Sequence, residues 1–371
     1  MRVGFDARWY NDAGVGTYVA ELLRALVRRG DCELIVYQNP ENLVPGLDGL
    51  TGKSVLVHAG KYSLTAQFDL RRRIRQDNLD VVHSPFYMMP LAAGCPVVVT
   101  MHDLIPFLFH IYPWPKQEMV KMGYRAAASR ATHIIADSQS TANDVQRILR
   151  VPAERITTVY CAVPQDCFHP RANAGELQHL REKFGVQPPY VLAASARNWR
   201  TKNLASALQA LELTREQSGV DFQTVVYGPA DGIKALGEED RWNRLNVCCT
   251  GSIKAEDLAR LFRYAHLFIM PSLYEGFGLP ILEAMSCGCP VVTSNGGSLA
   301  EVAGQGAQVF DPLDIVGMAR AAAVLLSNPE DRERWRLVAL RRSADFSWDE
   351  AAAQTVSVYH QTYKQYRARK S

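Results

Sequence analysis

The fold of this chain is decided by residues 267–283, which read LFIMPSLYEGFGLPILE. The stretch opens with an unbroken apolar run, Leu267 to Met270, of the kind found in a strand that is buried on both faces of a parallel sheet. Glycines then interrupt regular structure, and apolar residues resume around Pro280, which suits the first turn of a helix. The stretch therefore predicts a strand, a loop and a helix in succession. In open parallel sheets, ligands bind beyond the carboxyl ends of the strands, at corners of this kind.

Two glutamates lie in this corner with seven residues between them. We expect Glu275 in the loop and Glu283 in the first turn of the helix, so that two carboxylates flank the unpaired N–H groups of a helix N-terminus. A simpler interpretation, sufficient for a lone glutamate, is that an acid at this place favours the helix dipole. The pairing of the two acids behind a buried strand is compatible with a ligand site as well.

Short apolar runs recur along the whole chain and alternate with helical stretches. This alternation predicts two doubly wound parallel sheets joined by an irregular, proline-containing segment at 164–173. We expect domains at 1–168 and 169–349. The expected strands are 3–6, 34–37, 55–57, 81–83, 97–100, 133–137 and 156–159 in the first domain, and 191–194, 224–227, 247–250, 267–270, 291–293 and 308–310 in the second.

Two loops of the first domain carry candidate functional residues. Gly14 and Gly16 precede a helix, and the backbone there could meet a diphosphate, although glycines at such turns also serve packing. The dinucleotide fingerprint is incomplete, because Val19 stands where its last glycine belongs. His102 follows a predicted strand and is either a structural or a ligand-facing histidine. Asp103 either orients that imidazole or caps the following turn, and we favour the cap.

The first loop of the second domain carries Arg197 and Lys202, two cations aimed at the carboxyl edge of its sheet. Cations there could stabilise a leaving diphosphate, or they could be solvated surface groups. Arg200 is a further cation in the same loop. Gly251 and Ser252 follow another strand, and a tight turn is the simplest interpretation of that pair.

Composition excludes several classes of protein. At 371 residues, 47% hydrophobic and 21% charged, the chain can bury two ordinary cores. A formal net charge of +3 gives no support for nucleic-acid binding. No signal-peptide pattern and no long apolar span occurs, so we expect a cytoplasmic protein. The eight cysteines lack zinc-like spacing, which predicts packing residues in a reducing compartment and no metal site.

The run SLYEGFGLPILEAM, residues 272–285, resembles the E-x7-E signature of the retaining GT-B glycosyltransferases grouped as family 4. The segment HDLIP is similar to a family segment whose histidine reaches the transferred sugar. The loop ARNWRTK, 196–202, resembles the family's G-R-x4-K loop but has Ala196 in place of the usual glycine. The resemblance covers most of the chain and is weakest at 38–80.

The resemblance implies an α/β fold of the GT-B type, with two Rossmann-like domains that face a central cleft. The first domain would take the acceptor, and the last helix, 350–371, would cross back onto it. The second would bind the nucleotide sugar, with Glu275 on the sugar and Glu283 on the ribose. The implied catalytic residues are His102, Arg197, Lys202 and Glu275, and the implied substrate-binding residues are Gly14, Gly16, Gly251, Ser252, Gly276, Phe277, Gly278, Leu279, Glu283 and Glu301. Ser298 and Glu301 match a segment near the donor, or they form an ordinary capping box.

The implied activity is transfer of a mannose- or glucose-type hexose from a GDP- or UDP-sugar to a hydroxyl of a growing or lipid-linked glycan, as in bacterial polysaccharide or glycolipid synthesis. No metal and no cofactor is implied beyond the donor substrate. A sugar-nucleotide epimerase and a non-catalytic binding protein are the alternatives. The basic runs at 24–29 and 71–75 are either solvated surfaces or contacts with the inner face of an anionic cell membrane. In the second case, Tyr112 and Trp114 would be interfacial anchors.

Overall fold

The computed structural model describes residues 1–10, 14–47, 52–58, 64–90, 93–195, 199–229 and 239–369, without the side chains of 64–67, 199–200 and 239–241. The chain divides into two compact units. Unit 1 comprises Met1–Ala162 and Ser347–Ser371, and unit 2 comprises Val163–Phe346. The division falls between 162 and 163, slightly before the expected boundary at 168.

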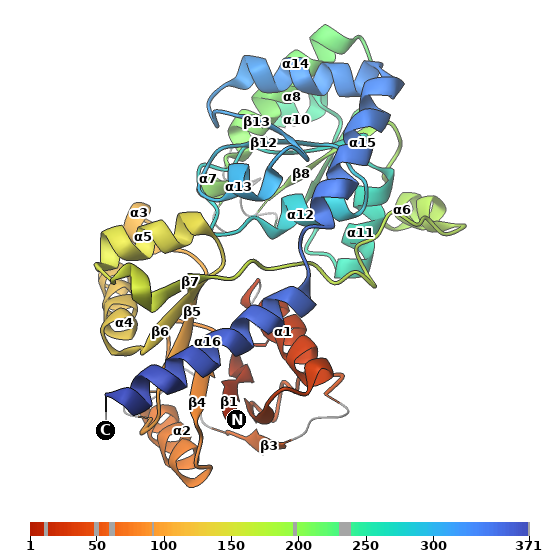
Figure 1. Cartoon of the computed structure of the whole chain (residues 1–371). Coiled ribbons are helices and arrows are strands. Elements are labelled where there is room, and N and C mark those ends of the chain that lie inside the picture. The colour runs from red at the N-terminus through yellow and green to blue at the C-terminus, as the bar shows by residue number, and fades with distance from the viewer. Residues whose placement is uncertain are drawn as a thin grey trace. The chain divides into compact units, whose positions relative to one another are not determined.

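Unit 1 is built on a seven-stranded parallel sheet in the order β3-β2-β1-β4-β5-β6-β7 (Figure 1). Because β1 and β4 are neighbours, the direction of winding reverses between them, which makes this the switch point of the sheet. The strands are β1 (Arg2–Asp6), β2 (Glu33–Gln38), β3 (Lys53–Leu56), β4 (Val81–Ser84), β5 (Val97–Met101), β6 (His133–Ala136) and β7 (Ile156–Thr158). The helices are α1 (Val15–Arg29), α2 (Leu64–Gln76), α3 (Ile105–Leu108), α4 (Lys116–Arg130), α5 (Gln139–Leu149) and α16 (Trp348–Ala368), with short 3-10 helices η1 (Ala7–Trp9) and η2 (Ala153–Arg155).

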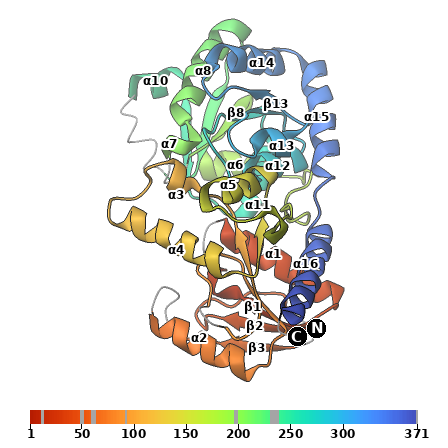
Figure 2. The ribbon, with the colours of Figure 1, turned by 60° about the vertical axis from the view of Figure 1, so that its left-hand side comes forward.

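Helices cover both faces of this sheet. One core joins α2, α4 and α5 to the strands through residues such as Leu70, Val120 and Val145. On the other face α1 and α16 lie side by side, as both views show (Figures 1 and 2). Helix α1 ends at Gly30, whose positive φ of 68° gives a left-handed C-terminal cap.

A buried polar chain joins α16 to the sheet of unit 1. The ring of His83 contacts the Thr100 Oγ1 at 2.8 Å through Nε2 and the Tyr359 hydroxyl at 2.7 Å through Nδ1. The Tyr18 hydroxyl of α1 lies 2.9 Å from the same Thr100 oxygen. Burial lowers the pKa of His83 to about 3, so the imidazole is neutral and can donate from one nitrogen and accept at the other. The last helix is thus bonded into the core of unit 1.

Unit 2 is built on a six-stranded parallel sheet in the order β10-β9-β8-β11-β12-β13. Its switch point lies between β8 and β11. The strands are β8 (Tyr190–Ala194), β9 (Gln223–Tyr227), β10 (Val247–Gly251), β11 (Leu267–Met270), β12 (Val291–Ser294) and β13 (Gln308–Phe310). The helices are α6 (Glu176–Phe184), α7 (Trp199–Lys202), α8 (Leu204–Ser218), α10 (Glu239–Arg244), α11 (Ala255–Tyr264), α12 (Leu279–Ser286), α13 (Leu299–Ala303), α14 (Ile315–Ser327) and α15 (Pro329–Ser343). Two Rossmann-like units confirm the expected fold class.

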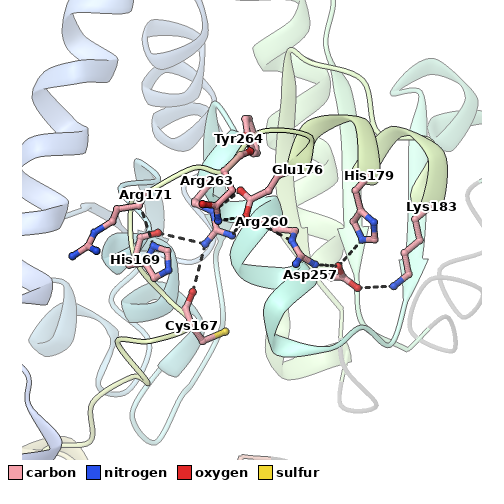
Figure 3. Close-up of polar contacts among 11 residues, drawn as sticks. Cys167, His169, Arg171, Glu176, His179, Lys183, Asp257, Arg260, Arg263 and Tyr264 are labelled. Atoms are coloured by element: carbon pink, nitrogen blue, oxygen red, sulfur yellow. Dashed lines mark hydrogen bonds and ion pairs between the residues drawn. The ribbon is translucent and has the colours of Figure 1, made fainter.

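A network of ion pairs ties α6 to α11 on unit 2 (Figure 3). Arg263 binds both oxygens of Glu176, at 3.0 and 2.7 Å. Asp257 accepts hydrogen bonds from His179, Lys183 and Arg260. Arg263 also reaches the backbone carbonyls of Cys167 and His169, so the segment that follows the domain boundary is fixed to α11.

Asp257 makes this network sensitive to acid. Its own burial raises the pKa, but the hydrogen bonds from Lys183, His179 and Arg260 outweigh that effect and lower the pKa to about 2. A lowered folded-state pKa stabilises the protein above the ordinary value near 4, and this stabilisation is lost as the pH falls through 2. We expect Asp257→Asn to lower the free energy of unfolding by up to about 2 kcal/mol at pH 7, and by roughly half as much at pH 3.

Urea unfolding of both proteins at pH 7, 5 and 3 measures this difference. A difference that stays constant over the three pH values contradicts the assignment to Asp257 ionisation.

The part of the chain that the structure describes lacks two features. No helix within it is long and apolar enough to cross a membrane. Nor does it contain a group of three or more histidine, cysteine, aspartate or glutamate side chains that could hold a metal ion.

Candidate active site

The loop after β11 is fixed in shape by a second loop, which follows β12. Glu275 forms a parallel bridge with Gly297, whose φ is +64°. A Cβ at Gly297 would lie 2.2 Å from the Glu275 carbonyl oxygen, and one at Gly296 would lie 2.4 Å from that of Ser272. Side chains are therefore excluded from both positions, because the two backbones touch.

Ser298 completes this attachment. Its Oγ lies 2.7 Å from the Phe277 carbonyl oxygen and 3.2 Å from that of Glu275. Helix α13 begins at the next residue, but the Ser298 side chain makes no capping hydrogen bond to it. The capping-box interpretation is therefore wrong for Ser298, which instead holds the loop that carries Glu275. Glu301 lies in the first turn of α13, and its carbonyl accepts a hydrogen bond from Arg342.

Lys202 and Glu275 form an ion pair, with 2.7 Å between Nζ and Oε1 and both side chains mostly buried. The lysine ends α7, after β8, and the glutamate follows β11, so the pair spans the switch point of the sheet. The two segments are bonded together. The Leu273 N–H donates to the Thr201 carbonyl at 2.7 Å, and Asn203 Nδ2 donates to the Pro271 carbonyl at 3.1 Å. The sequence brings a cation and a carboxylate to the place where α/β sheets bind ligands.

Glu283 lies in the second turn of α12 rather than in the first turn that we expected. Gly278, with a φ of +94°, is the residue before the helix, and Pro280 occupies its first turn. Burial raises the pKa of Glu283 to about 7, against a smaller opposing effect of Lys202. Near neutral pH this carboxyl therefore exists in both protonation states.

The neighbouring loop residues differ in what they can offer to a ligand. The Phe277 side chain is buried and packs edge-on against Phe346, with 5.9 Å between ring centroids, so any contribution to binding comes from its backbone. Gly276 and Gly278 are in the same loop, and Leu279 begins α12.

Two further predicted positions, Gly251 and Ser252, lie at the carboxyl end of β10. Gly251 has a φ of +68° and its carbonyl accepts a hydrogen bond from the Gly228 N–H at 2.9 Å. Gly228 itself approaches the Ser195 carbonyl so closely that a Cβ would lie 2.2 Å from it. Ser252 is exposed beside this edge. Arg197, by contrast, lies outside the described residues, as does the side chain of Arg200.

In unit 1, His102 is held at both ring nitrogens. Nδ1 forms an ion pair with Asp137, and Nε2 donates to the Pro85 carbonyl at 2.8 Å. Burial lowers the pKa of His102, but the Asp137 carboxylate and the two hydrogen bonds outweigh it and raise the pKa. Both nitrogens donate in this arrangement, which favours the imidazolium form. Asp103 accepts from the Ile105 N–H at 2.8 Å, which confirms its role in the following turn.

Asp137 is the residue that sequence reasoning missed. It follows β6, just as His102 follows β5, and the pairing of Met101 with Ala136 places the two side by side. A search for polar residues that end adjacent predicted strands could have found this pair.

The first loop of unit 1 follows β1 at the other switch point. Asp6 and Arg8 form a buried bidentate ion pair, with both N···O distances 2.8 Å. Gly14, with a φ of +78°, precedes α1, and Gly16 is buried in its first turn. Gly14 therefore precedes the helix as predicted, whereas Gly16 lies within it, and the nearby residues 11–13 lie outside the described chain.

An aromatic pocket of about 560 Å³ opens beside Asp103, between the loop after β4 and the helices α3 and α4. Its walls include Tyr87 and Tyr124, which stack with 4.0 Å between centroids, and Tyr112, over which the Lys116 ammonium lies at 4.7 Å. Asp103 contributes a carboxylate to the lining. Pockets of this size and mixed character bind small organic ligands.

Two Rossmann-like units in one chain are the architecture of the GT-B class of glycosyltransferases. Comparison with known proteins agrees. Residues 178–340 match the family described as Glycosyl transferases group 1, and residues 13–166 match Glycosyltransferase Family 4. O-antigen chain mannosyltransferase B of Escherichia coli is 32% identical over 291 residues, which are 75% of this chain and 74% of that protein. The chain belongs to glycosyltransferase family 4.

Solved structures share the fold at low sequence identity. Sucrose-phosphate synthase from Thermosynechococcus elongatus superposes with a TM-score of 0.76 at 18% identity, over 98% of this chain and 100% of that one. The Anabaena protein Alr3699/HepE, solved in complex with UDP and glucose, gives a TM-score of 0.75 at 17% identity, over 96% and 99% of the two chains. The present chain is a glycosyltransferase with the GT-B fold.

Proposed function

We propose that this enzyme is a retaining hexosyltransferase that moves a mannose- or glucose-type sugar from GDP or UDP to a hydroxyl of a growing or lipid-linked glycan. The observation that carries the proposal is the Lys202–Glu275 ion pair at the switch point of unit 2. The named activities of the similar proteins support the range of donors, since one is a mannosyltransferase and another was solved with UDP and glucose.

In this proposal, different residues of unit 2 bind different parts of the donor. Glu275 accepts hydrogen bonds from the sugar hydroxyls, with the backbone N–H groups of 276–278 beside it. Lys202, together with Arg197, neutralises the diphosphate as it leaves. Glu283 binds the ribose hydroxyls, and Gly251 and Ser252 contact the base. The acceptor attacks from the face that the diphosphate leaves, and the leaving phosphate takes its proton.

The residues of unit 1 take the acceptor. The aromatic pocket offers ring faces for the C–H face of a sugar and the Asp103 carboxylate for its hydroxyls. His102 donates to the transferred sugar, which requires its Nε2–H to exchange the Pro85 carbonyl for a sugar oxygen. Gly14 and Gly16, at the start of α1, are proposed substrate contacts.

The reaction itself tests the proposal. We expect thermal stabilisation by GDP or UDP, followed by release of that nucleoside diphosphate from the matching donor when acceptor is added. Because protein cations assist the leaving group, activity should persist in excess EDTA. Product NMR should show the anomeric configuration of the donor. An isomerised donor without release identifies an epimerase, and a requirement for Mg²⁺ or Mn²⁺ overturns the metal-free mechanism.

We propose further that unit 1 contacts an anionic membrane through α2 and α4. Phe68 on α2, Trp114 just before α4, and Met119 and Met122 on α4 are 68%, 78%, 66% and 65% exposed, and both helices also carry arginines or lysines. The run at 24–29 is a weaker candidate, because Arg24, Arg28 and Arg29 are already paired with Glu21, Asp349 and Asp31.

Sedimentation with vesicles tests this contact. We expect binding to vesicles with phosphatidylglycerol, weaker binding to phosphatidylcholine alone, and about a fivefold loss of affinity in Trp114→Ala, since an interfacial tryptophan contributes on the order of 1 kcal/mol. Equal binding of Trp114→Ala and the unchanged protein contradicts the role of α4. Leu313→Ala, which alters a similarly exposed apolar side chain on unit 2, is the control.

A further inference from the structure

Tyr227, the last residue of β9, crosses the sheet of unit 2 toward the Glu275 loop. Its strand partner on β8 is Ala194, and β8 lies between β9 and β11. Because alanine leaves the space above β8 open, the tyrosine ring extends over it. The ring centroid lies 6.2 Å from that of Phe268 on β11 and 6.1 Å from that of Phe262 on α11.

The hydroxyl of Tyr227 is buried, and it has no hydrogen-bond partner among the described residues. Desolvation raises its pKa, and the charges of Glu283 and then Glu275 raise it further, which places the phenol in the field of both carboxylates. A buried hydroxyl without a partner destabilises a protein, and such groups call for a functional explanation. The other buried tyrosine of this sheet differs, since the Tyr190 hydroxyl donates to the Leu261 carbonyl at 2.6 Å.

We propose that Tyr227 binds a ribose hydroxyl of the donor nucleotide beside Glu283. The inference rests on the proposed function, because it requires a nucleoside diphosphate in unit 2. A ribose offers two neighbouring hydroxyls, each of which both donates and accepts. An ionised carboxylate can only accept, so Glu283 takes hydrogens from the ribose hydroxyls, whereas the phenol supplies the O–H donor to a hydroxyl oxygen that the carboxylate lacks. The unpaired hydroxyl of the free enzyme is then satisfied on binding.

This role predicts opposite effects of one substitution on stability and on binding. Tyr227→Phe removes a hydroxyl that is unpaired in the free protein, so its melting temperature should be unchanged or higher. The same substitution should weaken nucleoside-diphosphate binding about tenfold, the usual effect of one lost hydrogen bond. Tyr190→Phe is the matched control, for which we expect a lower melting temperature and unchanged nucleotide affinity.

Deoxynucleotides identify the contact directly. Calorimetric titration of the unchanged protein and of Tyr227→Phe would use GDP and UDP with their 2′-deoxy and 3′-deoxy forms. We expect the unchanged protein to lose about tenfold in affinity for one of the deoxy forms, and Tyr227→Phe to lose less than threefold for that same form, because the partner is already absent.

The outcomes separate the two proposals. If the unchanged protein binds the nucleotides and Tyr227→Phe binds them equally well, or if both proteins show the same losses with both deoxy forms, the role of Tyr227 is overturned while the proposed function stands. If the unchanged protein binds neither GDP nor UDP, the donor assignment fails and this inference fails with it.

Discussion

If Glu275 positions the donor sugar as proposed, its replacement by alanine is expected to lower kcat by about 100- to 1,000-fold. The affinity for nucleoside diphosphate should stay nearly unchanged. The carboxylate is paired with Lys202 and fixed by a loop that Ser298 and Gly297 hold in place. A group fixed in this way orients the sugar as charge develops on it. Its removal should therefore destabilise the transition state more than it weakens nucleotide binding.

Glu283→Ala should behave differently, because its carboxyl is assigned to the ribose. We expect about a tenfold higher KM for the donor and a kcat within a few-fold of normal, since ribose binding contributes alike before and during reaction. The pKa of Glu283 near 7 adds a pH signature. Nucleotide affinity should rise as the pH increases from 6 to 8 and the carboxyl ionises, and Glu283→Ala should lose this dependence.

Steady-state kinetics and nucleotide titration of both variants measure these effects. Glu333→Ala is the control, because that glutamate is exposed and paired with the neighbouring Arg336 of α15, away from the proposed site residues. An equal loss of nucleotide affinity in Glu275→Ala and Glu283→Ala, with kcat intact in both, would contradict the assigned roles.

The second large effect concerns stability. Asp6 and Arg8 are paired with their side chains almost fully buried, at 0% and 1% exposure. Removal of one charge from a buried pair leaves the other uncompensated in a medium that solvates it poorly. We therefore expect Asp6→Asn to lower the free energy of unfolding of unit 1 by about 3 kcal/mol.

Urea unfolding tests this, with Glu33→Gln as the control. Glu33 pairs with Arg2 at the surface, so we expect its substitution to change the free energy of unfolding by less than about 1 kcal/mol. The double variant Asp6→Leu/Arg8→Met, which removes both charges, should recover most of the loss. A loss for Asp6→Asn no larger than that for Glu33→Gln would show that the buried pair does not stabilise unit 1.

The strands and the Glu275 corner were predictable because their signals are local. A strand buried on both faces, such as β11, is a continuous apolar run, and the glycines and Pro280 after it mark the loop and the helix start. The alternation of such strands with helices then determines a doubly wound fold, since parallel strands need crossover connections.

Contacts between distant parts of the chain were not predictable in the same way. From the sequence, the Ser298 hydroxyl could cap α13 or bond to the loop that carries Glu275. It bonds to the loop because the two backbones approach each other closely at Gly297. The sequence alone gives no partner for Arg28, because the residue that it pairs with, Asp349, is 321 positions away along the chain. The pKa of Glu283 depends on how much protein surrounds it, which spacing along the chain does not reveal.

The bond between His83 and Tyr359 has a consequence for the order in which the protein is made. Unit 1 consists of two pieces of chain with all of unit 2 between them. During synthesis from the N-terminus, unit 2 is complete before α16 leaves the ribosome, while the sheet of unit 1 still lacks the helix that covers His83. The nascent chain thus passes through a stage in which unit 2 can fold while the part of unit 1 that α16 covers, including the ring of His83, is still exposed to solvent and to chaperones.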